Sequence, residues 1–258
     1  MKYKGLRFVF CIYYDIIILA GAEIKIEMRE TDMGVIKLYH GSEYVVKEPI
    51  FGKGKSTNDY GKGFYCTEDM ELAKEWACSR NNDGFANAYE LDLEGMNILR
   101  LNEPPFNVLN WLAILADNRT YWEKNAISEN AKQYLREHFL IDISEYDVII
   151  GYRADDSYFT FAQNFVANGI SLQQLQVAMR LGKLGEQIVL KSLRAFEQIK
   201  FITYENALAE EYFMKKAVRD REARRQYTKN VRNHPNNNDL FMLDIMREGI
   251  KNGDSRLL

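Results

Sequence analysis

The sequence predicts an α+β fold, and three observations lead to that prediction. Strand-forming patterns gather in residues 35–101 and return in residues 148–202. A long stretch with helical periodicity, residues 106–140, separates the two groups of strands, and charged helical patterns close the chain over residues 205–251. Strands that flank a helical insert and are followed by a helical tail are typical of the α+β class.

Residues 35–101 hold the clearest strand patterns. Residues 44–63 are rich in Gly, Lys, Asn and Asp and therefore predict a loop. Residues 69–79 predict a helix, with Asp69 or Thr67 as its cap. Runs of β-branched and aromatic residues predict four strands: Val35–Tyr39, Gly63–Cys66, Ala86–Leu93 and Ile98–Leu101.

The rest of the chain alternates helices with short strands. In the 106–140 segment, Val108, Leu109, Leu112 and Leu115 fall on one helical face. Further strands are expected at Val148–Tyr152, Gln187–Leu190 and Ile199–Ile202. Further helices are expected at Ser171–Leu181, Leu193–Glu197, 205–230 and Leu240–Lys251, with a break at Asn233–Asn238.

Composition limits the classes of function. Of the 258 residues, 47% are hydrophobic and 28% are charged, which is typical of a globular protein. The net charge of −3 provides no overall attraction to nucleic acid or acidic membranes. The three cysteines, Cys11, Cys66 and Cys78, form no CxxC pair, so no zinc site is supported, and their odd number fits a reducing cytoplasm.

The first thirty-three residues stand apart from the rest. Residues 6–22 form an apolar run that contains Arg7 near its start and is broken by Asp15, and Lys2 and Lys4 precede it. A signal peptide and a membrane anchor are two interpretations, although the run is short for a span. The third interpretation, which we favour, is translated upstream sequence with the true start at Met28 or Met33. With a start at Met33, no membrane partner is expected.

Two short motifs carry the residues suited to chemistry. The first is Leu38-Tyr39-His40-Gly41-Ser42, at the end of the first expected strand. The second runs from Asp59 to Thr67 and contains Gly61-Lys62-Gly63-Phe64-Tyr65, and the helix after it ends in Ala73-Lys74-Glu75-Trp76-Ala77. Taken separately, each has a plain structural explanation, because the histidine can be structural and the glycines can simply build a tight turn.

In this order and spacing, the motifs resemble the histidine–tyrosine class of ADP-ribosyltransferases, which includes diphtheria toxin and the poly(ADP-ribose) polymerases. They also resemble an uncharacterised bacterial family with the same pattern, often suspected to be toxins. The resemblance runs from Val35 to about Ile202. It implies a split β-sheet core with a helical insert in residues 34–203, followed by a helical extension in residues 204–258.

The resemblance implies a site for NAD⁺ as substrate, with no metal. His40 would hydrogen-bond a ribose hydroxyl, and the backbone of Gly41 would pair with the nicotinamide carboxamide, assisted by the Ser42 hydroxyl. Tyr65 would lie against the nicotinamide ring, since an aromatic face attracts a planar cation. Trp76 falls where the polymerases place a second stacking ring, although a core anchor is an equally good interpretation.

A later strand of the family begins with the residue that stabilises the ribose during bond cleavage. Here Glu186 and Gln187 are adjacent, and neighbours on a strand point to opposite faces, so only one can enter the site. Alignment with the polymerases selects Glu186, whereas the bacterial pattern selects Gln187, which we favour. A glutamine cannot act as a general base, so Gln187 predicts mono-ADP-ribosyl transfer or slow NAD⁺ hydrolysis.

The remaining expectations concern partners. The acceptor is a macromolecule, either protein or nucleic acid, and the resemblance makes an antitoxin protein plausible. A catalytically weak module that binds NAD⁺ or ADP-ribose, or an NAD⁺ glycohydrolase, is the alternative. Asp155 and Asp156 could orient an acceptor or bind a metal, although adjacent acids more often cap a turn or a helix. The loop lysines Lys53, Lys55 and Lys62 could meet the NAD⁺ pyrophosphate or simply be solvated.

Overall fold

The fold is described from a computed structural model of the chain. The structure describes residues 34–120, 125–154, 156–183, 185–233, 236 and 238–257, excepting the side chains of Asp156 and Lys183. The expectations about a start codon, signal or anchor concern residues 1–33 and lie outside the described residues. Within the described ranges, no helix combines the length and the apolar character needed to cross a membrane.

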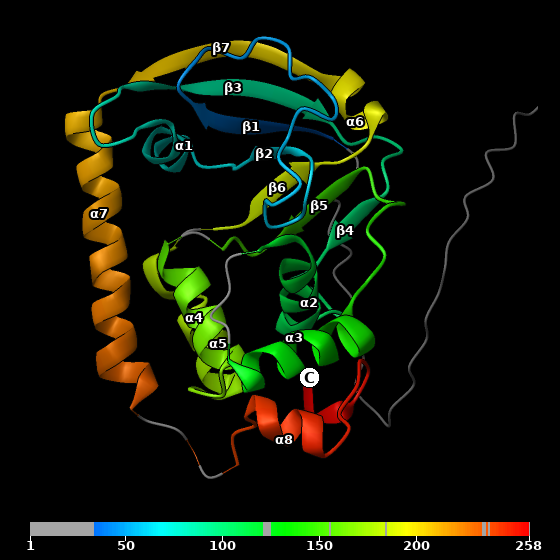
Figure 1. The fold of residues 1–258 in the computed structure, drawn as a ribbon. Helices are drawn as coiled ribbons and strands as arrows, with labels where there is room; N and C mark the ends of the chain where they lie inside the picture. The colour runs from blue at the N-terminus through cyan, green and yellow to red at the C-terminus, as the bar shows by residue number, and fades with distance from the viewer. Residues whose placement is uncertain are drawn as a thin grey trace, which may run out of the picture. The chain divides into compact units, whose positions relative to one another are not determined.

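Two β-sheets and a set of helices make up the fold, which confirms the α+β prediction (Figure 1). The strands are β1 (Val35–Ser42), β2 (Phe64–Cys66), β3 (Gly84–Asp92), β4 (Ile98–Arg100), β5 (Val148–Gly151), β6 (Gln187–Leu190) and β7 (Ile199–Ala207). The α-helices are α1 (Met70–Ala77), α2 (Val108–Asn118), α3 (Ala126–Phe139), α4 (Asp156–Val166), α5 (Leu172–Ala178), α6 (Leu193–Gln198), α7 (Ala209–Gln226) and α8 (Met242–Arg247).

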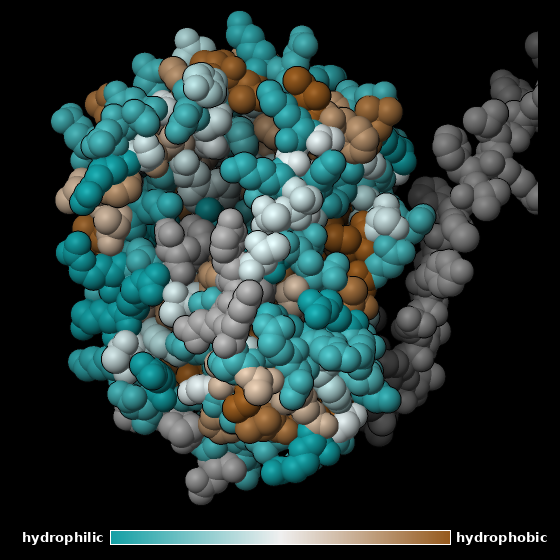
Figure 2. Space-filling model, in the orientation of Figure 1, coloured by the Kyte–Doolittle hydropathy of each residue, from teal (hydrophilic) through white to brown (hydrophobic). Residues whose placement is uncertain are grey.

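Long antiparallel strands form the first sheet, in the order β1-β3-β7. β1 pairs with β3 along its whole length, from Val35 opposite Asp92 to Ser42 opposite Phe85. One face packs into the core, where Leu38 and Leu91 are fully buried. β7 is largely exposed, and hydrophobic residues gather over it in one of several small patches on an otherwise mostly hydrophilic surface (Figure 2).

Much shorter strands form the second sheet, in the order β2-β6-β5-β4. The pairs β2·β6 and β6·β5 are antiparallel and β5·β4 is parallel. On β6, Ile188 and Leu190 join the core shared with the first sheet, whereas Val189 joins the core on the helical side. This sheet therefore lies between the first sheet and the helices.

The helical side encloses the larger hydrophobic core. α2 is buried along most of its length because its apolar residues are not confined to one face, and Trp111 is fully buried. A capping box at Asn107 and Asn110 fixes the start of α2. The C-terminal helix α8 closes this layer with Met242 and Ile245, both fully buried.

The structure differs from the sequence predictions at three elements. The helix expected from residue 205 begins at Ala209, because β7 continues to Ala207 and pairs there with β3, with Tyr204 edge-on to Phe85. α4 lies in a segment for which no element was predicted, although its buried residues Phe161 and Phe165 repeat at helical spacing. The closing helix expected at Leu240–Lys251 is confined to Met242–Arg247.

Candidate functional site

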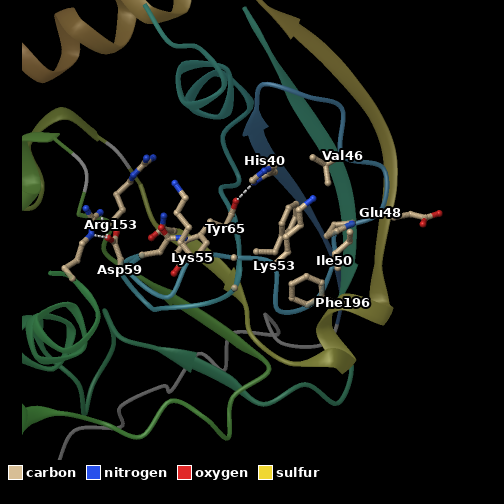
Figure 3. Close-up of a pocket in the computed structure, with 17 residues that line it drawn as sticks. His40, Val46, Glu48, Ile50, Lys53, Lys55, Asp59, Tyr65, Arg153 and Phe196 are labelled. Carbon is tan, nitrogen blue, oxygen red and sulfur yellow. Dashed lines mark hydrogen bonds and ion pairs between the residues drawn. The ribbon is translucent and has the colours of Figure 1, made fainter. Parts of the chain in front are cut away.

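A pocket of about 530 Å³ opens where the two sheets and the 43–63 loop meet. It is large enough for a small-molecule ligand, since such sites are typically ~300–1,000 Å³. His40 of β1, Tyr65 of β2 and Gln187 of β6 all line it (Figure 3). The loop provides most of the remaining wall, and Phe196, Arg119 and Arg153 complete it.

His40 is held in one orientation at this pocket. Its Nδ1 lies 2.7 Å from the carbonyl oxygen of Tyr65, and a carbonyl can only accept, so Nδ1 carries a proton and donates (Figure 3). The ring packs on Phe64 with centroids 4.3 Å apart. Burial lowers the pKa of His40 below its ordinary 6.5, although the hydrogen bond to Tyr65 opposes the shift. The neutral ring therefore keeps Nε2 as a hydrogen-bond acceptor.

Tyr65 is positioned through its hydroxyl group. The hydroxyl donates to the carbonyl oxygen of Gly61 at 2.5 Å and accepts from the backbone N–H of Tyr60 at 3.1 Å. Burial raises the pKa of Tyr65 well above its ordinary value, so the phenol stays protonated. With the hydroxyl engaged by the loop, the aromatic ring is the part of Tyr65 that faces the pocket.

Gln187 is the first residue of β6, and Glu186 directly precedes the strand. Gln187 is only 7% exposed, lines the pocket, and its Oε1 is buried without a hydrogen-bond partner among the described residues. Glu186 is exposed, accepts a hydrogen bond from Asn102 at 2.8 Å, and does not line the pocket. A buried amide oxygen without a partner is costly unless a ligand or water satisfies it.

A buried ion pair anchors the 43–63 loop, which leads into β2 and Tyr65. Asp59, only 5% exposed, lies 2.7 Å from Nε of Arg119 and accepts from the backbone N–H of Ala154 at 2.8 Å. Lys191 donates to the carbonyl oxygens of Tyr60 and Lys62, both at 2.6 Å, from the other side. These contacts tie the loop to the end of α2, the segment after β5 and the end of β6.

The charge on the pocket wall favours an anion. The lining cations are Lys53, Lys55, Arg119 and Arg153, and the lining carboxylates are Glu48 and Asp59. The Asp59 carboxylate is paired with Arg119, and Glu48 is exposed and points outward (Figure 3). A ligand with two or more negative charges therefore complements this wall.

Other residues that the resemblance assigns to the site lie beside the pocket and do not line it. Gly41 packs so tightly against α1 that an added Cβ would lie 2.0 Å from the carbonyl oxygen of Ala73 and 2.9 Å from Cβ of Trp76. The Ser42 hydroxyl donates to the carbonyl oxygen of Tyr44 and accepts from Asn87. The ring of Trp76 is covered by the guanidinium group of Arg153, whose Cζ lies 3.3 Å from the ring centroid.

Two residues of the wall, Arg119 and Phe196, were not singled out from the sequence. Arg119 follows α2, which lies far from the motifs in sequence, and Phe196 belongs to a short helix between two strands. Arg153, also part of the wall, was not assigned a role from the sequence either. Asp59 offers a sequence signal for Arg119. An acid in a glycine-rich loop needs a basic partner if the loop becomes buried.

The other polar candidates do not join this pocket. Asp155 and His234 lie outside the described residues, as does the side chain of Asp156. His138 lies on α3 with its ring on Tyr134, at a centroid distance of 4.3 Å. Across the described part of the chain, no three His, Cys, Asp or Glu side chains gather as metal ligands would.

Comparison with known proteins gives one match. No curated protein and no solved structure matches the chain. One family profile matches residues 36–201, a range that includes His40, Tyr65 and Gln187. The chain therefore belongs to the family described as "Protein of unknown function (DUF3990)".

Proposed function

We propose that the protein is an NAD⁺-dependent mono-ADP-ribosyltransferase with an ADP-ribosyltransferase-like split sheet. The observation that carries the proposal is the convergence of His40, Tyr65 and Gln187 on one pocket. These three residues come from strands separated in sequence, and the resemblance assigns them, among others, to NAD⁺ and its ribose.

The chemistry of the wall supports a dinucleotide ligand. Nε2 of neutral His40 is suited to accept a hydrogen bond from a ribose hydroxyl. Lys53 and Lys55 complement a pyrophosphate. The ring of Tyr65 offers an aromatic face to the nicotinamide cation.

Gln187 suits the ribose next to the bond that breaks. Its buried Oε1 can accept a hydrogen bond from a ribose hydroxyl, which would satisfy the amide. In the reaction, the bond between ribose C1′ and the nicotinamide nitrogen breaks, and its electron pair leaves with neutral nicotinamide. The oxocarbenium-like ribose is then attacked by an acceptor nucleophile, which loses a proton to solvent or to the acceptor's own base.

Two alternatives fit the same geometry: an NAD⁺ glycohydrolase and a module that holds NAD⁺ or ADP-ribose without chemistry. Two observations favour these alternatives: Gln187 carries no carboxylate, and the carboxylate of Asp59 is neutralised by Arg119. The macromolecular acceptor, a toxic effect in bacterial cytoplasm and an antitoxin partner are further parts of the proposal, and they rest on the resemblance.

The test uses NAD⁺ labelled on the adenine side, incubated with the purified protein in the presence and absence of cell lysate. Free nicotinamide and labelled macromolecules are followed for the wild type, His40→Ala and His138→Ala. We expect label to move to protein or nucleic acid in the wild type and in His138→Ala. Loss of this transfer in His40→Ala would tie it to the pocket.

The other outcomes separate the alternatives. Nicotinamide release without labelled product indicates a glycohydrolase. Thermal stabilisation by NAD⁺ without release indicates a binding module. Wild-type protein that neither turns over NAD⁺ nor is stabilised by it would exclude all three.

A further inference from the structure

Arg153 is the wall residue that connects the pocket with Trp76 and Gly41. Gly41 and Trp76 adjoin each other but do not line the pocket, whereas Arg153 does. The backbone N–H and C=O of Tyr39 bond to Thr67, so those of Gly41, two residues along β1, point to the same edge, away from β3. Trp76 packs on Gly41, since a Cβ added to the glycine would lie 2.9 Å from Cβ of Trp76, and its Nε1 is buried without a hydrogen-bond partner among the described residues.

Arg153 covers the indole of Trp76 in the manner of a bound planar cation. Its Cζ lies 3.3 Å from the ring centroid, which is direct stacking distance, and the side chain is only 7% exposed. The segment that holds it is fixed, because Tyr60 donates to the carbonyl oxygen of Tyr152 at 2.6 Å and the N–H of Ala154 donates to Asp59. The stack is therefore part of the folded pocket wall.

A nicotinamide ring and the Arg153 guanidinium group compete for this place. Both are planar cations that gain from the same aromatic face, and each repels the other. The ADP-ribose part of NAD⁺ lacks the nicotinamide cation, and its adenine ring is neutral. It therefore has no charge that the Arg153 guanidinium group repels.

We propose that Arg153 is a specificity-determining residue that covers the nicotinamide end of the pocket. ADP-ribose enters the pocket as it stands, whereas NAD⁺ binds completely only when Arg153 leaves Trp76. This inference rests on the proposed function, because it assumes that the pocket takes NAD⁺. The inference adds that Arg153, as part of the pocket wall, sets the affinity for NAD⁺ relative to the affinity for ADP-ribose.

The test measures the dissociation constants of NAD⁺ and ADP-ribose by calorimetry for the wild type, Arg153→Met and Lys55→Met. The two variants each remove one positive charge from the pocket wall, but only Arg153→Met uncovers Trp76. We expect Arg153→Met to shift the ratio of the two constants about three- to tenfold toward NAD⁺, a typical range for one cation–π contact. Lys55→Met should weaken both ligands and shift the ratio by less than about twofold.

Arg153→Lys is a second variant that tests the inference if Arg153→Met does not fold. It keeps the charge but lacks the planar group, so a smaller shift in the same direction is expected. An Arg153 variant that folds, binds both ligands and keeps the wild-type ratio overturns the inference and leaves the proposed function intact. Wild-type protein that binds neither NAD⁺ nor ADP-ribose overturns both.

Discussion

The two sheets differ in strand length and burial. β1, β3 and β7 have 8–9 residues, whereas β2, β4, β5 and β6 have 3–4 residues. The outer strands β1 and β7 expose several positions, and only the central strand β3 is buried or half-buried throughout. Every residue of β5 and β6 is buried. Both sheets contribute to the pocket, but the long one provides His40 and the short one provides Tyr65 and Gln187.

The comparison of the two sheets indicates where a polar residue is evidence for a ligand site. On the long sheet, Lys37 and Lys200 are exposed and need no explanation beyond solvation. On the short sheet, which has core on both faces, a buried polar side chain such as Gln187 must find a partner or serve a ligand. Variants in the two regions should therefore separate effects on stability from effects on function.

Asp59→Ala is expected to destabilise the protein most. It leaves Arg119 without the carboxylate it pairs with, in a position where both groups are largely buried, and breaking such a pair costs about 3–5 kcal/mol. The free energy of unfolding from urea denaturation measures this loss. Asp92→Ala, on the long sheet, is the control and should change stability by less than about 1 kcal/mol. Equal losses in both variants would refute the anchoring role of Asp59.

Gly41→Ala should destabilise the long sheet. The new Cβ would lie 2.0 Å from the carbonyl oxygen of Ala73 and 2.7 Å from the backbone N of Ala77, so α1 must move. Overpacking of this kind costs about 1–3 kcal/mol. Gly34→Ala, at the start of the same sheet, has no atom within 4 Å of the added Cβ and should be nearly neutral. Melting temperatures compare the two, and an unchanged value for Gly41→Ala would contradict the close packing.

Gln187→Ala should lower nicotinamide release about 10- to 100-fold, because one hydrogen bond in a buried site is typically worth ~1–3 kcal/mol. Glu186→Ala, its exposed neighbour, should change the rate by less than about twofold. Initial rates at saturating NAD⁺ distinguish them. A larger loss in Glu186→Ala would mean that the other face of β6 serves the reaction.

The smallest effect is the pH dependence of His40. Its pKa lies below 6.5 in the folded protein, so the neutral form is favoured there. The resulting stability is present above pH 6.5 and is lost as the pH falls through the folded pKa. NAD⁺ affinity should therefore stay constant from pH 8 to about 6.5 and fall only at lower pH. A decline that begins near pH 7.5 would show that His40 is not depressed.

Sequence reasoning recovered what is local and missed what depends on tertiary packing. The first strand and the 63–66 strand followed from residue type, and the His40 and Tyr65 motifs from their spacing. Period-two alternation correctly required that only one of Glu186 and Gln187 face inward, but not which one, because the facing layers decide that. The extension of β7 to Ala207 depends on pairing with β3. The Arg153 stack on Trp76 joins residues 77 positions apart (153 minus 76) and has no local signature.

The most direct test of the central claim is a calorimetric titration of NAD⁺ into the wild type, His40→Ala and His138→Ala. Removing the Nε2 acceptor should weaken NAD⁺ binding about 10- to 100-fold in His40→Ala. His138→Ala, with its ring on Tyr134 and away from the pocket, should match the wild type. Binding that is absent in the wild type, or equally strong in His40→Ala, would contradict the assignment of this pocket to NAD⁺.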